Sequence, residues 1–255
     1  MLPLYDRERR ARDRTMRCYL TLKCSMACEY CSARVPLVTP DRKEIYIPAS
    51  QWAEGLNRRK RNAVLAGGEP FLYPEFVDLI LLLDKGLRAE IYTNLVVDLS
   101  DFLSRVDRNF AMLVSLHVGV PDWDQWWEGV TALEAKGNRL RFHVVRCGDW
   151  EERVEFLKTK DARITTCADQ TRHPKSLPEN QVDNVRCRTC TYMYGPDGLR
   201  YQCVTKLGLG EDPVASLECD PDDIDWHENF CSHFGNCAGC DGLLEGTTVK
   251  TDDPI

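Results

Sequence analysis

The sequence contains no hydrophobic run long enough to cross a membrane. The longest candidate, FVDLILLLD at residues 76–84, is bounded by acidic residues and falls far short of the roughly 20 apolar residues that a membrane-spanning helix needs. The first residues, MLPLYDRERRARDRTMR, are charged and lack the apolar stretch of a signal peptide. No contact with a membrane is therefore expected, and the sequence predicts a cytoplasmic protein.

The chain also lacks a net positive charge. It has 33 Lys and Arg residues against 40 Asp and Glu residues, a formal net charge of -7, so no global attraction to nucleic acid is expected. Basic residues gather in two short runs, RERRARDR at 7–14 and NRRKRN at 57–62. We interpret both runs as solvated surface. A local contact with nucleic acid is the alternative.

Cysteine, in contrast, is abundant. The chain has 13 cysteines in 255 residues, and in a reducing cytoplasm such a number indicates metal binding or catalysis rather than disulfides. Three of them lie close together in KCSMACEYC at 23–31, and seven more lie in the last third of the chain. Cys18, Cys147 and Cys167 stand alone in apolar surroundings and are predicted to be buried side chains.

Strand and helix patterns alternate through the first two thirds of the chain. The segments predicted to be strands are 17–24, 62–67, 88–94, 110–117, 139–146 and 162–167. The segments predicted to be helices are 50–59, 74–86, 99–106, 122–137 and 150–159. This alternation is typical of a parallel sheet covered by helices, and six units are fewer than the eight of a closed barrel.

The predicted fold class is therefore α/β, a partial (β/α)6 TIM-like barrel with a small Cys-rich C-terminal extension. The predicted domains are an N-terminal extension at 1–15, the partial barrel at 16–168 and the Cys-rich domain at 169–255. Trp123, Trp126 and Trp127 lie at helical spacing in one predicted helix and are expected to cover the core.

Chemically versatile residues recur where the predicted strands end. The cysteine triplet follows the first strand, GGEP at 67–70 follows the second, and Asn94 and His117 close the third and fourth. Because the carboxyl ends of parallel barrel strands meet at one mouth, these features are expected to converge there. His143 and Arg146, near the end of the fifth strand, are further candidates for substrate contact.

The triplet itself indicates an iron-sulfur cluster. Cys24, Cys28 and Cys31 could bind three irons of a four-iron, four-sulfur cluster and leave the fourth iron without a protein ligand. A zinc site is the alternative, but structural zinc prefers four protein ligands, and no fourth Cys or His lies nearby.

The triplet's spacing, with the aromatic Tyr30 before its last cysteine, resembles the signature of radical S-adenosylmethionine (radical SAM) enzymes. GGEP after the next strand resembles that family's second motif. The resemblance covers roughly residues 16–168. It implies that the open iron binds S-adenosylmethionine (SAM) through its amino and carboxylate groups. Reductive cleavage then yields a 5′-deoxyadenosyl radical that abstracts a hydrogen atom from the substrate.

The resemblance also implies roles for individual residues. Gly67 and Gly68 would receive the methionine amino group with Glu69 nearby, Tyr30 would border the adenine, and Ser115 would contact the cofactor. An external one-electron reductant of the flavodoxin or ferredoxin type would be the partner. The chain departs from the family in RFHVVRCGDWEE at 141–152, where a glycine-rich stretch for the ribose is not evident.

A second group of cysteines follows the predicted barrel. Its members are Cys187, Cys190, Cys203, Cys237 and Cys240. Two Cys-x-x-Cys pairs indicate a metal site, and zinc is again the alternative. Their layout, with Gly198 shortly before Cys203, resembles the twitch or SPASM extensions of radical SAM enzymes. That likeness implies an auxiliary 4Fe-4S cluster bound by Cys187, Cys190, Cys203 and one of the late pair, while Cys219 or Cys231 could serve a further cluster.

Three functions agree with these features. The first is a radical SAM enzyme that oxidises or dehydrogenates a small molecule with the help of the auxiliary cluster. The second is a radical SAM isomerase, aminomutase or bond-forming enzyme acting on a modified nucleobase in nucleic acid or on a peptide. The third is a non-catalytic zinc-binding module, which leaves GGEP unexplained.

Overall fold

The structure is a computed structural model that describes residues 15–28, 30–31, 45–168, 185–189, 192–218, 227–230 and 248–250. The first six strands are β1 (Thr15–Tyr19), β2 (Asn62–Ala66), β3 (Ala89–Thr93), β4 (Ala111–Ser115), β5 (Arg139–Arg146) and β6 (Ile164–Ala168). They pair in chain order, and every pair is parallel.

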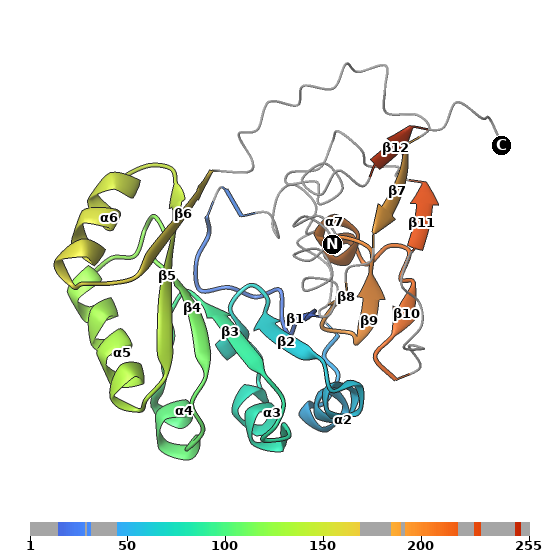
Figure 1. Ribbon diagram of the computed structural model, residues 1–255, viewed down its shortest axis with the longest axis horizontal. Coiled ribbons are helices and arrows are strands. Elements are labelled where there is room, and N and C mark those ends of the chain that lie inside the picture. Colours follow the sequence, from blue (N-terminus) through green and yellow to red (C-terminus); the bar gives the residue numbers. More distant parts are fainter. Residues whose placement is uncertain are drawn as a thin grey trace, which may run out of the picture.

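Helices connect these strands and cover the outer face of the curved sheet (Figure 1). They are α2 (Ala49–Arg59), the short 3-10 helix η1 (Pro70–Leu72), α3 (Phe76–Leu82), α4 (Ser100–Arg105), α5 (Trp123–Ala135) and α6 (Trp150–Thr159). The sheet does not close on itself, so the predicted partial barrel is confirmed.

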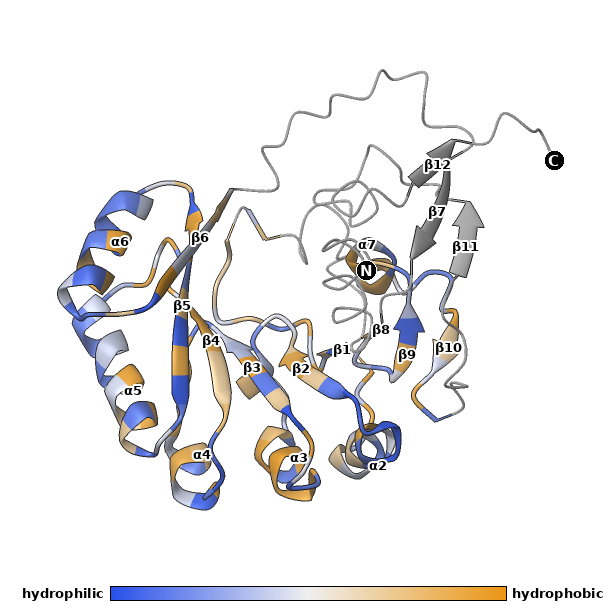
Figure 2. Ribbon diagram, in the orientation of Figure 1, coloured by the Kyte–Doolittle hydropathy of each residue, from blue (hydrophilic) through white to orange (hydrophobic). Residues whose placement is uncertain are grey.

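Local sequence explains why these elements form where they do. In β1, Met16 and Cys18 are fully buried and alternate with half-buried neighbours, as a strand with one face on the core requires. In α5, the Asp122 carboxylate caps the helix by accepting a hydrogen bond from the Gln125 backbone N–H at 2.9 Å. Figure 2 shows apolar and polar residues side by side on the outer helices, as expected for elements with one buried face.

The first strand differs from its predicted bounds. It spans Thr15–Tyr19, whereas the sequence predicted 17–24. The apolar character of the segment continues past Tyr19, but the backbone carbonyls of Thr21 and Lys23 bond to the turn that follows β2. These tertiary hydrogen bonds end the strand pairing before the first cysteine of the triplet.

The buried core lies between the sheet and its helices. Trp126 is 5% exposed and packs edge-on against Phe142, and Trp127 and Trp123 lie half-buried against Phe156. The expectation that the tryptophans of this helix cover the core is confirmed.

The three isolated cysteines differ in their burial. Cys18 and Cys147 are buried as predicted, but Cys167 is only half-buried, so the prediction was wrong for it. Cys167 lies on β6, the last strand of the sheet, where no further described strand covers the outer edge.

Part of the Cys-rich region extends the barrel sheet. β8 (Tyr192–Tyr194) pairs in parallel with β1, and β9 (Leu199–Tyr201) and β10 (Ala215–Ser216) continue the sheet in antiparallel fashion. Helix α7 (Val204–Leu209) follows β9, and β7 (Val185–Thr189) lies between β11 (His227–Phe230) and β12 (Thr248–Lys250) in a separate sheet. The predicted domain boundary at 168/169 stays a prediction, although the two regions share one sheet.

Two arginines of the basic run at 57–62 bind this C-terminal region. Arg58 donates to the Leu217 carbonyl at 2.9 Å, and Arg59, only 8% exposed, donates to the Gly55 carbonyl at 3.0 Å and the Ser216 carbonyl at 3.4 Å. The interpretation of the run as solvated surface is therefore wrong for Arg59, whereas Arg58 is exposed as expected. Across the described part of the chain, no helix has both the length and the apolar character to cross a membrane.

Candidate functional site

The three cysteines of the triplet lie on the segment that follows β1, which we call the cysteine loop (residues 20–31, with residue 29 outside the described residues). Cys24, Cys28 and Cys31 are half-buried. The Cys31 backbone N–H donates to the Cys28 carbonyl at 3.2 Å, so a tight turn joins the last two. The loop lies at the carboxyl end of the parallel strands, as predicted.

The GGEP turn (residues 67–70) holds the cysteine loop through its backbone. The Gly68 N–H donates to the Thr21 carbonyl at 2.8 Å, and the Glu69 N–H donates to the Lys23 carbonyl at 2.8 Å. A Cβ atom at Gly67 would lie 2.2 Å from the Thr21 oxygen, and one at Gly68 would lie 2.2 Å from the Lys23 oxygen. Both glycines are therefore required for the contact between the two motifs, a role that the sequence did not reveal. Their predicted role in binding the methionine amino group stays a prediction.

Glu69 is fully buried between the second and third strands of the barrel. Its carboxylate accepts hydrogen bonds from the Thr93 hydroxyl at 2.8 Å, the Asn94 backbone N–H at 2.7 Å and the Phe71 backbone N–H at 3.3 Å. Burial raises the pKa of Glu69 to about 7, while these three donors act in the opposite direction.

This burial predicts a pH-dependent contribution to stability. The folded-state pKa of Glu69 lies above the ordinary value of 4.5, so the folded state binds more protons between about pH 4.5 and 7. The free energy of unfolding should therefore fall as pH rises through this window. Relative to Glu69→Gln, which cannot ionise, the wild type should lose up to about 3 kcal/mol between about pH 4.5 and 7.5, measured by urea denaturation of the cluster-free proteins.

Glu54→Gln is the matched control for this experiment. Glu54 is exposed on α2 and makes no side-chain hydrogen bond or ion pair among the described residues, so the free energy of unfolding of its variant should change with pH as that of the wild type does. The prediction would be contradicted if the difference in free energy of unfolding between the wild type and Glu69→Gln stayed constant as pH rises. It would also be contradicted if the wild type became more stable relative to the variant.

Asn94 connects the GGEP turn to the first cysteine. Its backbone N–H binds Glu69, and its side-chain amide donates to the Cys24 sulfur at 3.4 Å. Its side-chain oxygen accepts from the Ser25 hydroxyl at 3.3 Å, and its carbonyl accepts from the Trp126 indole N–H at 2.7 Å. Asn94 thus helps to hold the cysteine loop in place. Its predicted contact with substrate stays a prediction.

Tyr30 and His117 join the far end of the cysteine loop to β4. Their rings stack with centroids 5.8 Å apart, and the Tyr30 oxygen lies 2.8 Å from His117 Nδ1. The Tyr30 oxygen also accepts a hydrogen bond from the Val118 backbone N–H at 3.2 Å. Burial, and then the positive charge of Arg153, lowers the pKa of His117 to about 4, so the ring is neutral at about pH 7. The predicted contact of Tyr30 with adenine stays a prediction.

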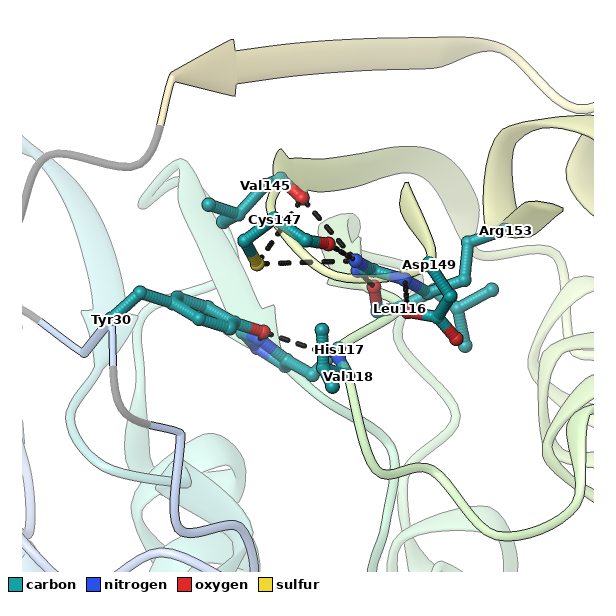
Figure 3. A network of polar contacts seen from close by, with 8 residues as sticks. All are labelled: Tyr30, Leu116, His117, Val118, Val145, Cys147, Asp149 and Arg153. Atoms are coloured by element: carbon teal, nitrogen blue, oxygen red, sulfur yellow. Dashed lines mark hydrogen bonds and ion pairs between the residues drawn. The ribbon is translucent and has the colours of Figure 1, made fainter. Parts of the chain in front are cut away.

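A buried arginine fixes the loops that follow β4 and β5 (Figure 3). Arg153 of α6 is fully buried; its guanidinium pairs with Asp149 at 2.9 Å and donates to the carbonyls of Leu116 at 2.7 Å and Cys147 at 2.5 Å. Because a buried cation must satisfy its donors, these contacts fix where the two loops lie relative to each other. His117 follows Leu116 directly, so Arg153 positions one wall of the mouth. No sequence pattern marked this residue, which lies in an ordinary helical segment.

The other mouth candidates are distributed as follows. Ser115 is half-buried at the end of β4, beside His143 of β5 in the strand register. His143 lies 3.3 Å from the Thr165 hydroxyl and 3.1 Å from the Cys167 sulfur, and Arg146 is exposed at the end of β5. The predicted contacts of Ser115, His143 and Arg146 with cofactor or substrate stay predictions.

The second group of cysteines is described only in part. The Cys203 sulfur caps α7 by accepting from the Lys206 N–H at 3.5 Å, and Cys187 lies on β7. Gly198, in the turn before β9, has a positive φ of 73° that favours glycine. Cys190, Cys237 and Cys240, like Cys219 and Cys231, lie outside the described residues.

The donors of the cysteine loop are suited to an iron-sulfur cluster. Cys24 already accepts hydrogen bonds from two N–H groups, those of Asn94 and of the Met26 backbone at 3.4 Å, and such bonds stabilise a thiolate bound to iron. Burial raises the pKa of the Cys28 thiol, so metal binding there would release a proton. Within the described residues, no three Cys, His, Asp or Glu side chains surround a single ion position. A four-iron cluster instead binds each thiolate through a different iron.

Solved structures with a similar fold exist for this chain. No family model and no curated protein matches the chain. The structure of anSMEcpe with bound AdoMet matches with a TM-score of 0.56 and 15% sequence identity over 80% of this chain and 78% of that one. SuiB from Streptococcus suis matches with a TM-score of 0.48 and 12% sequence identity over 86% of this chain and 67% of that one. BtrN in complex with AdoMet and 2-DOIA matches with a TM-score of 0.44 and 13% sequence identity over 80% of this chain and 78% of that one.

All three of these proteins are radical SAM enzymes. The chain spans between 64% and 67% of the length of SuiB in the three structures of that protein. At these sequence identities the similarity concerns the fold alone. It rests on the match to anSMEcpe, which has the highest TM-score of the three, 0.56.

Proposed function

We propose that this chain, which has the radical SAM fold, is an enzyme that cleaves SAM reductively and abstracts a hydrogen atom from its substrate. Cys24, Cys28 and Cys31 would hold a 4Fe-4S cluster at the carboxyl ends of the strands. With SAM bound, the cluster supplies the radical chemistry, and the protein orients the substrate and excludes water.

One observation carries this proposal. The GGEP turn, 36 residues beyond the triplet in sequence, donates two backbone hydrogen bonds to the cysteine loop and reaches Cys24 through Glu69 and Asn94. A structural zinc site would need no such second motif beside its cysteines. The AdoMet bound to the structurally similar anSMEcpe supports the same ligand here.

The reaction that we propose is the oxidation or dehydrogenation of a small molecule. Cys187, Cys190, Cys203 and one of Cys237 and Cys240 would bind an auxiliary 4Fe-4S cluster able to accept the electron left on the substrate after hydrogen abstraction. A flavodoxin or ferredoxin would supply the electron that cleaves SAM. A peptide substrate is the second candidate, since anSMEcpe is also known with bound AdoMet and the Kp18Cys peptide.

Anaerobic reconstitution with iron and sulfide tests the cofactors. About eight irons per chain are expected if both clusters form, and about four if only the first does. Addition of SAM and dithionite should then release 5′-deoxyadenosine, detected by chromatography. A protein that binds zinc in place of iron and leaves SAM intact would refute the proposal, while about four irons with active cleavage would remove only the auxiliary cluster.

A further inference from the structure

An arginine lies at, or just before, the start of each strand from β2 to β6. These residues are Arg61, Arg88, Arg108, Arg139 and Arg163, which stand no more than three residues ahead of the strands that they precede. Because the strands are parallel and adjacent, their amino ends form one edge of the sheet. This edge is opposite the one that carries the cysteine loop.

A cleft of about 1000 Å³ opens at this edge, and we call it the strand-start cleft. Its lining includes six basic side chains: Lys85, Arg88, Arg108, Arg139, Arg141 and Arg163. Among the described residues that line it, Glu90 is the single acidic one, and none is aromatic. The cleft is therefore strongly basic in a chain whose formal net charge is -7.

Two of the six basic side chains have partners within the protein. Arg141 pairs with Glu90, and the Arg108 guanidinium lies 5.1 Å from the centre of the Phe110 ring and donates to the carbonyls of Asp84 and Leu87. These contacts neutralise one positive charge of the lining, that of Arg141.

The other four side chains keep their donors for a ligand. Lys85, Arg88, Arg139 and Arg163 are exposed and have no side-chain partner among the described residues. Like charges gathered in a concave surface repel one another and concentrate the electrostatic potential, so an anion bound there relieves the repulsion.

The chemistry of the lining selects a class of anion. Guanidinium groups bind phosphate and carboxylate oxygens through paired hydrogen bonds, and several phosphates are needed to match this many cations. A single-stranded nucleic acid would also need aromatic side chains on which its bases stack, and the described lining has none. The volume of the cleft is that of a small-molecule site.

We propose that the strand-start cleft binds a small ligand that carries two or more phosphate groups. The eight residues of β5 span roughly 23 Å between Arg139 in the cleft and Arg146 at the mouth. The cleft is thus a second site, separate from the cysteine loop, and its occupation does not depend on the proposed radical chemistry.

Titration calorimetry with inorganic tripolyphosphate, on reconstituted protein at constant ionic strength, tests this proposal. The wild type should bind one tripolyphosphate per chain, and Arg88→Gln/Arg139→Gln should bind it at least about tenfold more weakly. Arg146→Gln is the matched control, because Arg146 is an exposed arginine at the other end of the same strand. Its affinity should stay within about twofold of the wild type.

Three results would overturn the proposal. The first is the absence of binding to the wild type, and the second is an equal loss in Arg146→Gln, which would indicate general charge attraction. The third is tight binding of a single-stranded RNA that tripolyphosphate fails to displace, which would make the partner a nucleic acid. Circular dichroism and iron content, expected to be unchanged in both variants, separate loss of binding from loss of folding.

Discussion

Replacing Cys28 with alanine should abolish the release of 5′-deoxyadenosine from SAM. Cys28 is the central thiol of the triplet, half-buried on the cysteine loop and joined by a tight turn to Cys31. Without it, two protein thiolates remain to hold a cluster that needs three. Since even the loss of a residue that only supports a metal ligand costs about 10- to 100-fold, we expect release to fall by at least about 100-fold.

Iron analysis separates this effect from a purely kinetic one. Cys28→Ala should contain about four fewer irons per chain than the wild type after reconstitution, because one whole cluster is lost. Cys18→Ala is the matched control: it removes a thiol from β1, before the cysteine loop begins, where Cys18 is fully buried in the core. This variant should retain its iron and its activity. Wild-type iron content in Cys28→Ala would show that the triplet does not bind the cluster.

Replacing Gly68 with alanine should destabilise the protein by about 3 kcal/mol or more. The added methyl group would lie 2.2 Å from the Lys23 carbonyl oxygen, and a backbone atom cannot move aside as a flexible side chain can. The shift needed to relieve this overlap would break the hydrogen bonds from Gly68 to Thr21 and from Glu69 to Lys23. The free energy of unfolding, measured by urea denaturation, reports the effect.

Gly86→Ala is the control for Gly68→Ala. A Cβ atom at Gly86 would have no atom within 4 Å, and Gly86 does not have a positive φ, so alanine there should change stability by no more than about 0.5 kcal/mol. Equal stability of Gly68→Ala and the wild type would mean that the GGEP turn does not hold the cysteine loop as described. A loss of stability together with a loss of iron would show that the two motifs form one unit.

The alternation of strands and helices was predictable because each element has its own hydrophobic period. The five helices from α2 to α6 and the six parallel strands appear where the sequence predicted them, with shifts of a few residues. The error at β1 has a specific cause. The segment after Tyr19 is apolar enough to continue a strand, but the carbonyls of Thr21 and Lys23 accept hydrogen bonds from Gly68 and Glu69 of the GGEP turn. Because that turn lies more than 40 residues further along the chain, the contact leaves no trace in the local pattern.

The side-chain network of the site was less predictable than its motifs. Asn94 was identifiable as a polar residue at the end of a strand, but its bonds to Cys24, Ser25 and Trp126 depend on how three separate segments pack. Arg153 carries no motif, and only its full burial against the Leu116 and Cys147 carbonyls reveals that it positions the mouth. Such roles follow from three-dimensional neighbours, which a single sequence does not specify.

Spacing and hydrophobic period are local properties of a chain. They were therefore enough to specify the alternating elements, the spacing of the three cysteines proposed to bind the cluster, and the turn that accompanies them. The contacts that these elements, cysteines and turn make were decided only by the tertiary structure. Folding packed two glycines against the cysteine loop and buried Glu69, whose carboxylate accepts a hydrogen bond from the Asn94 backbone N–H. It also placed arginines that are distant in sequence, such as Arg88 and Arg163, at one edge of the sheet. Parallel pairing collects residues that are distant in the chain, and the free energy of burial then depends on neighbours that no local pattern contains.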